Sequence, residues 1–185
     1  MELIKTSEVF EDIKYFKGKF FPDERGFFKK PFYGSNLDDY FKNVSEVLVS
    51  KSKKNVIRGL HFQTPPHEVS KIVHCVEGKV KDVFLDLRKD SPTYGKHDSV
   101  YLDDDKNITV LIPKGFAHGF SVLSENATVV YLQSGDFNEA SDSGIYCLDL
   151  GIDWEVDIPV LSEKDQNLVK FSEYESPWKF KWEIV

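Results

Sequence analysis

The sequence predicts an all-β fold, an antiparallel β-sandwich or barrel with a few short helices. Seven short segments in the middle of the chain are rich in β-branched and aromatic residues. Turn formers such as Pro65, Pro66 and Gly78 separate these segments. Helical patterns occur only in two short stretches. Many short strands at this spacing are typical of sandwiches and barrels.

The expected strands follow one another along the middle of the chain. They span residues 56–62, 71–76, 80–87, 99–102, 108–112, 119–123 and 127–132. The two expected helices span residues 35–41 and 162–169. In the third strand, alternation puts Asp82, Phe84 and Asp86 on one face. That face is either solvated or lines the polar interior of a barrel that holds a ligand.

Length and charge set limits on the class of protein. The 185 residues, 41% of them hydrophobic, suit one domain, which we expect to span residues 1–185. No stretch approaches the roughly 20 apolar residues of a membrane span, and the first residues lack a secretion signal. We therefore expect a cytoplasmic protein without a membrane partner. The net charge of −7 argues against nucleic-acid binding, although a small anionic ligand needs only a local positive pocket.

Cysteine and arginine are both rare in this chain. Cys75 and Cys147 lie in apolar, strand-like sequence, so we expect two reduced structural thiols. Arg25, Arg58 and Arg88 are the only arginines, and every other strong cation is a lysine. The planar guanidinium suits bidentate recognition of phosphate or carboxylate. These arginines are therefore candidate anion-binding residues.

Two segments each end in a histidine, His61 and His118, in strand-rich surroundings. The pair resembles the two half-motifs of the cupin superfamily, small β-barrels with a polar interior site. Many cupins bind a metal through a His-x-His motif, a glutamate and a later histidine. Here Gln63 stands in place of the second histidine, and its amide is a poor ligand for a transition metal. A metal site of His61, Glu68 and His118 would be weak, and we predict no metal.

A sharper resemblance covers nearly the whole chain. The following motifs occur in the order found in the dTDP-4-dehydrorhamnose 3,5-epimerase family: Arg25-Gly26-Phe27-Phe28, Arg58-Gly59-Leu60-His61-Phe62-Gln63, Lys71, Asp82-Val83-Phe84-Leu85-Asp86-Leu87-Arg88, Ser91-Pro92-Thr93-Tyr94-Gly95, Ile112-Pro113-Lys114-Gly115-Phe116-Ala117-His118-Gly119-Phe120, Gly151-Ile152-Asp153-Trp154 and Leu161-Ser162-Glu163-Lys164-Asp165. So many motifs in one order argue strongly against coincidence. The resemblance implies a cupin-type antiparallel barrel that epimerises a nucleotide-linked 4-keto-6-deoxy sugar without a cofactor.

The implied chemistry is the removal and return of a proton. A ketone at C4 acidifies the hydrogens on C3 and C5, so the enzyme needs a base, a group that stabilises the enolate, and an acid on the opposite face. The resemblance assigns His61 as the base and Tyr131 as the acid. It pairs Asp165 with His61, as the aspartate of a catalytic triad pairs with its histidine. Lys71 would stabilise the C4 oxygen.

Further residues are implied to hold the substrate. His118 and Asp82 would complete the polar shell, with Asp82 fixing Lys71 or a histidine. Arg25 and Arg58 match the positions that hold the diphosphate in relatives, and Phe20 and Phe28 would pack against the nucleotide base. Relatives often complete this pocket across a dimer, so we expect a homodimer.

Departures from the family pattern concern the substrate. Lys30 stands where the family has a glutamate that contacts thymine. Lysine offers only donors and guanine presents O6 and N7, so a GDP-linked rather than dTDP-linked sugar is our hypothesis. Glu46 and Leu48 replace polar sugar contacts, which suits a bulkier sugar such as a 6-deoxy-heptose. Gln63 is a further expected substrate contact. Phe137 replaces a tyrosine of the family, so a hydroxyl near the sugar is missing. The sequence therefore leaves open whether the enzyme inverts C3, C5 or both.

Other functions compete with this hypothesis. The nearest is a 4-keto sugar 3,4-ketoisomerase, which would need no opposing acid. A non-catalytic sugar-nucleotide binding protein comes next, and a metal-dependent cupin oxygenase comes last. The family places the epimerase in deoxysugar synthesis for a surface polysaccharide, such as a capsule or lipopolysaccharide.

Overall fold

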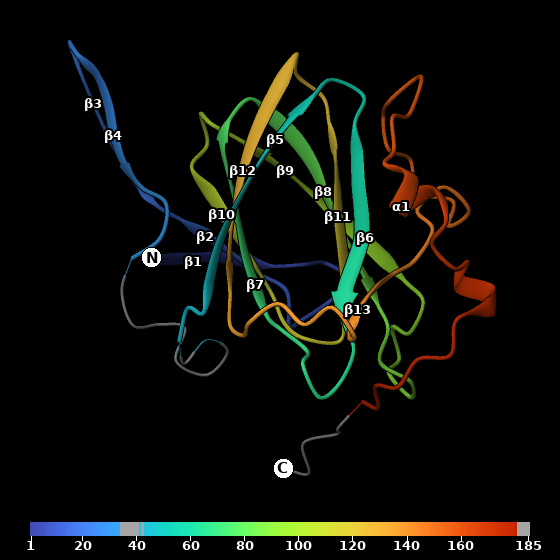
Figure 1. Ribbon diagram of the computed structural model, residues 1–185. Coiled ribbons are helices and arrows are strands. Elements are labelled where there is room, and N and C mark those ends of the chain that lie inside the picture. The colour runs from blue at the N-terminus through green and yellow to red at the C-terminus, as the bar shows by residue number, and fades with distance from the viewer. Residues whose placement is uncertain (34–40, 42, 181–185) are drawn as a thin grey trace.

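The computed structural model describes residues 1–33, 41 and 43–180 and is built almost entirely of β-strands (Figure 1). One sheet has the order β1 (Glu2–Thr6), β2 (Lys14–Lys17), β10 (Ile108–Ile112), β7 (Lys71–Glu77), β12 (Asn126–Gln133), β5 (Glu46–Lys53). The second has the order β13 (Asp142–Gly144), β6 (Ile57–Gln63), β11 (Phe116–Val122), β8 (Lys79–Asp86), β9 (His97–Asp103). A separate hairpin joins β3 (Lys19–Asp23) to β4 (Gly26–Lys30). Strands pair antiparallel throughout these sheets, which confirms the predicted all-β class.

Each of the seven predicted strands overlaps an observed one, β6 to β12. The predicted strands omitted β1 to β5 and β13. The strand β5, for example, mixes valines with serines and lysines, and its pattern is weak because it forms an edge of its sheet. The predicted helix over 162–169 is a single turn, α1 (Glu163–Gln166), and a 3₁₀ turn follows at Phe171–Glu173. The predicted helix over 35–41 falls almost entirely outside the described residues.

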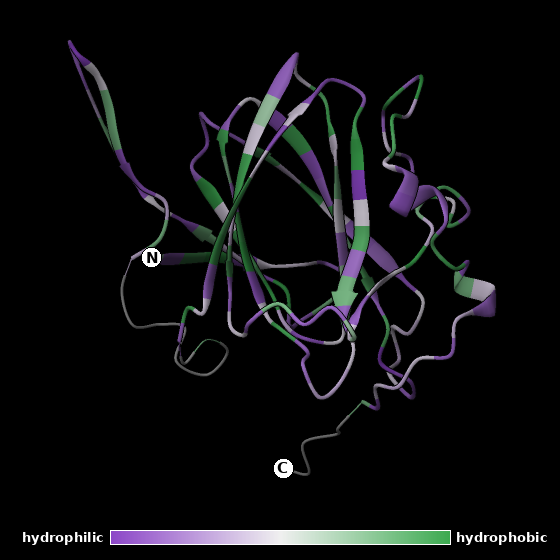
Figure 2. Cartoon of the chain, viewed as in Figure 1, coloured by the Kyte–Doolittle hydropathy of each residue, from purple (hydrophilic) through white to green (hydrophobic). Residues whose placement is uncertain are grey.

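The main hydrophobic core lies between the two larger sheets. Phe84 and Phe120 from one sheet pack with Val73 and Val129 from the other. Asp82 and Asp86 are fully buried, and Asp82 forms a hydrogen bond with His118 of the neighbouring strand β11. The face of β8 that carries Asp82 therefore lines the barrel interior and is not solvated. Hydrophilic and hydrophobic stretches alternate along β6 and β12 (Figure 2).

The outer faces of both sheets are also covered. Leu85 and Leu87 pack under the segment after β13, where Trp154 and Trp178 lie. Ile72 of β7 packs outside the six-stranded sheet, in a smaller cluster with residues near the N-terminus. Cys75 and Cys147 are buried and free, which agrees with the prediction of structural thiols.

The β3–β4 hairpin projects away from the barrel (Figure 1). Phe20 and Phe28 are 40% and 60% exposed, and Phe21 and Phe27 are similarly uncovered. Such a cluster of exposed aromatic side chains is unusual for a surface that faces only water. Within the described residues, no helix is long and apolar enough to cross a membrane.

Candidate active site

A cavity of about 330 Å³ lies inside the barrel between the two larger sheets. It is lined from both sides by side chains that share polar or aromatic character: Ser50, Arg58, His61, Gln63, Lys71, His118, Tyr131, Gln133, Phe137, Asp142 and Lys164. Strands β6 and β11 form one wall, and β5, β7 and β12 form the other. This cavity gathers half of the residues that the sequence predicted for the site.

His61 and His118 meet because β6 and β11 pair antiparallel with these two residues directly opposite. Residues opposite one another in adjacent strands put their side chains on the same face. The backbones approach closely beside them: a Cβ on Gly119 would lie 2.4 Å from the Arg58 carbonyl oxygen. Gly59 has φ +107°, a conformation that side chains disfavour. The close backbone approach and the positive φ angle therefore explain why glycine follows Arg58 and His118.

Asp165 supports His61 from outside the barrel. Its Oδ1 lies 2.6 Å from His61 Nε2, and Ser162 caps α1 by accepting from the Asp165 backbone N–H. Burial acts to raise the pKa of Asp165, but hydrogen bonds from His61 and from the backbone of Gly59 hold it below its ordinary value. The Asp165 carboxylate is thus ionised, and Nδ1 is the His61 nitrogen left to accept a proton.

A second histidine–carboxylate pair lies deeper in the barrel. His118 Nε2 is 2.8 Å from Asp82 Oδ2, and both side chains are almost completely buried. Burial raises the pKa of Asp82, against the lowering effect of His118 and Lys71. Of the two partners that the sequence allowed for Asp82, the hydrogen bond selects the histidine.

Lys71 reaches into the cavity from β7. Its Nζ donates to the His61 carbonyl oxygen at 3.3 Å. The strand β7 follows β6 along the chain but belongs to the opposite sheet, so Lys71 reaches His61 across the barrel. Burial lowers the pKa of Lys71 to about 8, although the charges of Asp142 and Asp82 act to raise it.

Tyr131 faces the cavity from β12, on the sheet opposite His61. Its ring packs against His118, with centroids 5.9 Å apart, and against Phe120. Burial raises the pKa of Tyr131 well above its ordinary value. The phenol therefore keeps its proton throughout the neutral range.

Other predicted substrate contacts differ in their placement. Arg58 lines the cavity, with its Nε donating to Ser52 Oγ at 2.8 Å, and Leu48 lines the mouth. Gln63 also lines it, but its amide is engaged by the loop backbone, accepting from Asn138 N–H and donating to carbonyls. Glu46 is not among the lining residues, because its carboxylate accepts from the Phe137 backbone.

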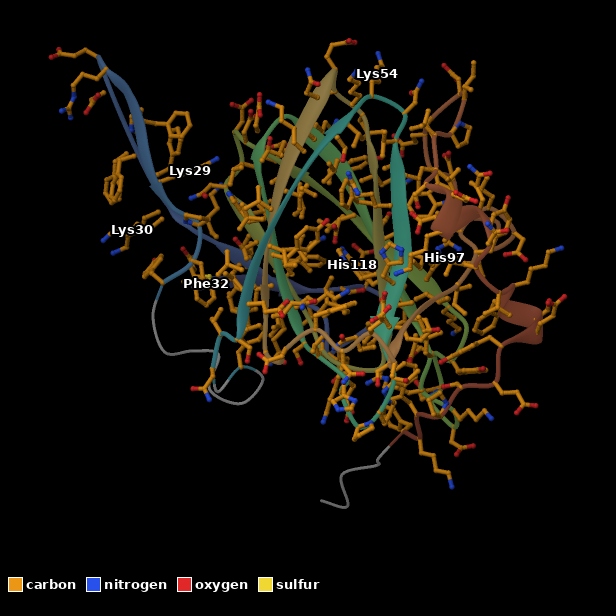
Figure 3. The ribbon with its side chains drawn as sticks, viewed as in Figure 1. Lys29, Lys30, Phe32, Lys54, His97 and His118 are labelled. Carbon is orange, nitrogen blue, oxygen red and sulfur yellow. The ribbon has the colours of Figure 1, made fainter. Side chains whose placement is uncertain are left out.

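The hairpin residues are not brought to the cavity of their own chain. Phe20, Arg25, Phe28 and Lys30 all lie on the projecting β3–β4 hairpin. The side chain of Arg25 is 84% exposed and pairs with Asp23. Lys30 lies on this hairpin, well apart from His118 in the barrel (Figure 3).

Glu68, the glutamate of the weak metal-site alternative, forms an ion pair with Lys114 at 3.2 Å. No group of three or more histidine, cysteine, aspartate or glutamate side chains is arranged to hold a metal ion in the part of the chain that the structure describes.

Sequence reasoning missed four polar lining residues. Ser50 and Gln133 lie on β5 and β12, while Asp142 and Lys164 form an ion pair at the cavity. Ser50 lies two residues after Leu48, so the two side chains share one face of a strand. This spacing was a signal for Ser50, but β5 itself was not predicted. Lys164 precedes Asp165, which could have suggested it.

Comparison with known proteins identifies the relatives of this barrel. Residues 8–173 match the family model for dTDP-4-dehydrorhamnose 3,5-epimerase. The chain belongs to that family. It is 42% identical to the dTDP-4-dehydrorhamnose 3,5-epimerase of Shigella flexneri, over 92% of this chain and 96% of that protein. It is therefore an epimerase, an isomerase that acts on sugar nucleotides, as predicted.

Solved structures agree with the fold. A dTDP-6-deoxy-D-glucose-3,5-epimerase from Legionella pneumophila, in complex with dTDP-4-keto-L-rhamnose, matches with TM-score 0.89 and 31% identity, covering 96% of this chain and 98% of that one. A 3'-monoepimerase from Streptomyces bikiniensis, with one histidine changed to asparagine and one tyrosine to phenylalanine, is in complex with dTDP. It matches with TM-score 0.82 and 28% identity, covering 93% and 87%. The predicted cupin-type barrel is confirmed.

Proposed function

We propose that this epimerase inverts C3 and C5 of a nucleoside-diphosphate-linked 4-keto-6-deoxy sugar, with His61 as the base and Tyr131 as the acid. The observation that carries the proposal is their placement on opposite sheets around one cavity. A sugar ring between the two walls presents one face to the imidazole and the other to the phenol. Loss of a proton to one side and its return from the other inverts the carbon.

His61 accepts the proton through Nδ1, because Asp165 engages Nε2. The ionised carboxylate orients the ring and stabilises the imidazolium that forms, as in a catalytic triad. The electron pair left on the substrate carbon moves onto the C4 oxygen and forms an enolate. An enolate inside a protein cavity is stabilised most by fixed positive charge and hydrogen-bond donors.

Lys71 and His118 supply that stabilisation. Both line the same cavity as the base and the acid. The ammonium of Lys71 faces the developing oxyanion, and Asp82 holds the ring of His118 in place. Because Asp82 acts through His118, it is a positioning residue.

Tyr131 then returns a proton to the opposite face of the carbon. The two positions changed in the monoepimerase variant are a histidine and a tyrosine seventy positions apart, and His61 and Tyr131 have the same separation. This match in residue type and spacing supports the assignment.

The substrate's diphosphate is bound by Arg58 in the cavity and by Arg25 of a second copy. We assign Arg25, Phe20 and Phe28 to the partner's site because they are exposed on a hairpin that projects from their own barrel. An aromatic hairpin of this kind is stabilised when its rings are covered by another surface. The active enzyme is thus a homodimer with shared sites.

Two observations bear on the carrier nucleotide. The relatives named above carry dTDP in their names or complexes, which supports a dTDP-linked sugar. Lys30 favours a second candidate, a GDP-linked sugar, because its donors suit the acceptor edge of guanine. Leu48 and Phe137 make the mouth of the cavity more apolar and favour a sugar with an extra carbon, such as a 6-deoxy-heptose.

The test follows deuterium incorporation at C3 and C5 by NMR in D₂O, with dTDP- and GDP-linked 4-keto-6-deoxy hexoses and heptoses. The wild-type enzyme is expected to exchange and invert both carbons of one carrier series. His61→Asn should abolish both processes while the chain still binds the free nucleoside diphosphate. Movement of the carbonyl to C3 would establish the ketoisomerase instead, and binding without exchange for every sugar would establish a binding protein.

A further inference from the structure

Ser50 contacts the phenol of Tyr131. Its Oγ lies 3.4 Å from the Tyr131 hydroxyl oxygen, and this is the one hydrogen bond of the phenol in the part of the chain that the structure describes. The contact arises from strand pairing. Leu48 lies directly opposite Tyr131 in the β5–β12 ladder, and Ser50, two residues further along β5, is the diagonal neighbour of Tyr131. The proposed function does not use this serine.

Proton balance shows why Tyr131 needs such a neighbour. Each inversion leaves an imidazolium at His61 and a phenolate at Tyr131. The resting enzyme returns only when the phenolate gains a proton and His61 loses one, so that one proton passes from His61 to Tyr131 through water. A second inversion, at the other carbon or in the next substrate, is impossible while the acid is discharged.

Direct access of water to the Tyr131 oxygen is restricted. His118 and Phe120 pack on the ring, and the bound sugar would lie against the phenol hydroxyl that protonates it. Ser50, in contrast, is only partly buried and lies on β5, an edge strand at the rim of the six-stranded sheet (Figure 1). Its hydroxyl is therefore in contact with both the buried phenol and the open side of the cavity.

A serine hydroxyl can donate and accept at the same time. The distance of 3.4 Å is long for an O–H···O bond, and such bonds shorten when the acceptor is charged. The bond therefore strengthens when Tyr131 becomes a phenolate. Arg58 acts in the same direction, because its positive charge favours the ionised phenol.

We propose that Ser50 is the positioning residue for Tyr131 and the relay that restores its proton. When the phenolate forms, Ser50 gives its hydroxyl proton to the Tyr131 oxygen and takes one from a water molecule in the cavity. The resulting hydroxide is neutralised by the proton that His61 releases to solvent. No oxidant, reductant or cofactor takes part. This inference rests on the proposed acid role of Tyr131 and extends it.

Threonine and valine provide a matched pair at this position, because they have the same shape and differ in the hydroxyl. Ser50→Thr is expected to keep most of the turnover rate. Ser50→Val should lower kcat by about tenfold to a hundredfold, the effect of one lost hydrogen bond to a charged group. Val47→Thr, at an exposed position of the same strand outside the cavity lining, is the control for changes in β5.

Two readouts separate a relay from a packing effect. In Ser50→Val, the first inversion should be fast and the later inversions slow, with tyrosinate absorbance rising during the reaction. Small proton donors such as imidazole should accelerate the slow phase, and they should have no effect on wild type.

Equal turnover rates for Ser50→Val and Ser50→Thr would overturn the inference. So would a slow Ser50→Val enzyme that shows neither a burst nor an effect of added imidazole. A wild-type enzyme that exchanges no deuterium at C3 or C5 would instead refute the proposed function, so the two failures are distinguishable.

Discussion

His61 Nε2 and Asp165 Oδ1 lie 2.6 Å apart although 104 positions separate the two residues in the chain. The contact joins β6 to the single helical turn α1, which holds Asp165 against the barrel wall. Because the carboxylate accepts from Nε2, it fixes the histidine tautomer whose Nδ1 carries the lone pair. This one contact sets both the orientation and the tautomer of the proposed base.

Removing the charge of Asp165 should therefore damage catalysis without removing the fold. Asp165→Asn keeps the size of the side chain, but its amide can neither stabilise an imidazolium nor enforce the tautomer. We expect kcat to fall by about 10³- to 10⁴-fold, as for the aspartate of a triad. Steady-state rates for this variant and for Asp157→Asn, an exposed loop control, provide the check. Similar rates for the two variants would contradict the dyad.

The site was only partly predictable from the sequence, and the reason is physical. Strands such as β6 and β8 have strong patterns because they are buried on both faces. Asp165 had no local signal, since a short polar helical turn is usually a surface element. Ser50 lies on an edge strand with a mixed pattern. Its contact with Tyr131 depends on strand register, which no local segment encodes.

Loss of the Tyr131 hydroxyl should separate proton removal from inversion. In Tyr131→Phe, His61 still abstracts a proton and returns a deuteron from D₂O to the same face. We expect exchange to persist at C3 or C5, while the rate of inverted product falls by about 10²- to 10⁴-fold. NMR of the recovered sugar measures both quantities in one experiment. Full inversion by this variant would show that Tyr131 is not the acid that protonates the opposite face.

The charge of Lys71 should set the alkaline limit of activity. Burial lowers the pKa of Lys71 to about 8, so the ammonium is present below that pH and is lost above it. The pH dependence of kcat/KM reflects the pKa values of groups in the free enzyme. We therefore expect kcat/KM to fall as the pH rises through about 8. Tyr131 does not account for such a fall, because burial raises its pKa far above this range.

Lys71→Arg tests that assignment. Arginine stays protonated at every accessible pH, so the alkaline fall should disappear or move to much higher pH, even if the rate at pH 7 is reduced. An unchanged fall near pH 8 in Lys71→Arg would assign the titration to another group.

Asp86 should contribute to acid stability rather than to catalysis. Burial acts to raise the pKa of Asp86, but hydrogen bonds from Arg88 and Thr93 hold it below its ordinary 3.8. A carboxyl group whose pKa is lowered on folding stabilises the fold when the pH is above the ordinary carboxyl pKa. This stabilisation is lost as the pH falls toward the folded-state pKa. Removing one partner of a buried pair costs about 3 to 5 kcal/mol, so Asp86→Asn should lower the free energy of unfolding by that amount at pH 7.

Asp12→Asn is the matched control, because Asp12 also pairs with Arg88 but is 41% exposed. An exposed pair contributes about 1 kcal/mol or less. Urea unfolding at pH 7 and at a pH well below 3.8 should show a large loss for Asp86→Asn at pH 7, a smaller one at the acid pH, and little change for Asp12→Asn. Equal losses at the two pH values would show that the Asp86 charge is not what stabilises the fold.

Lys30 should influence the choice of nucleotide from the partner subunit. The residue lies on the projecting hairpin, apart from the cavity of its own chain (Figure 3), and the proposed dimer would bring it to the substrate of the other copy. Lys30→Glu replaces donors with acceptors and should shift the ratio of affinities for dTDP and GDP toward dTDP by about tenfold, the scale of one specific base contact. Lys29→Glu is the control, because the Lys29 ammonium contacts the backbone of its own barrel. Titration calorimetry with both nucleotides measures the ratio, and an unchanged ratio in Lys30→Glu would remove the charge argument for GDP.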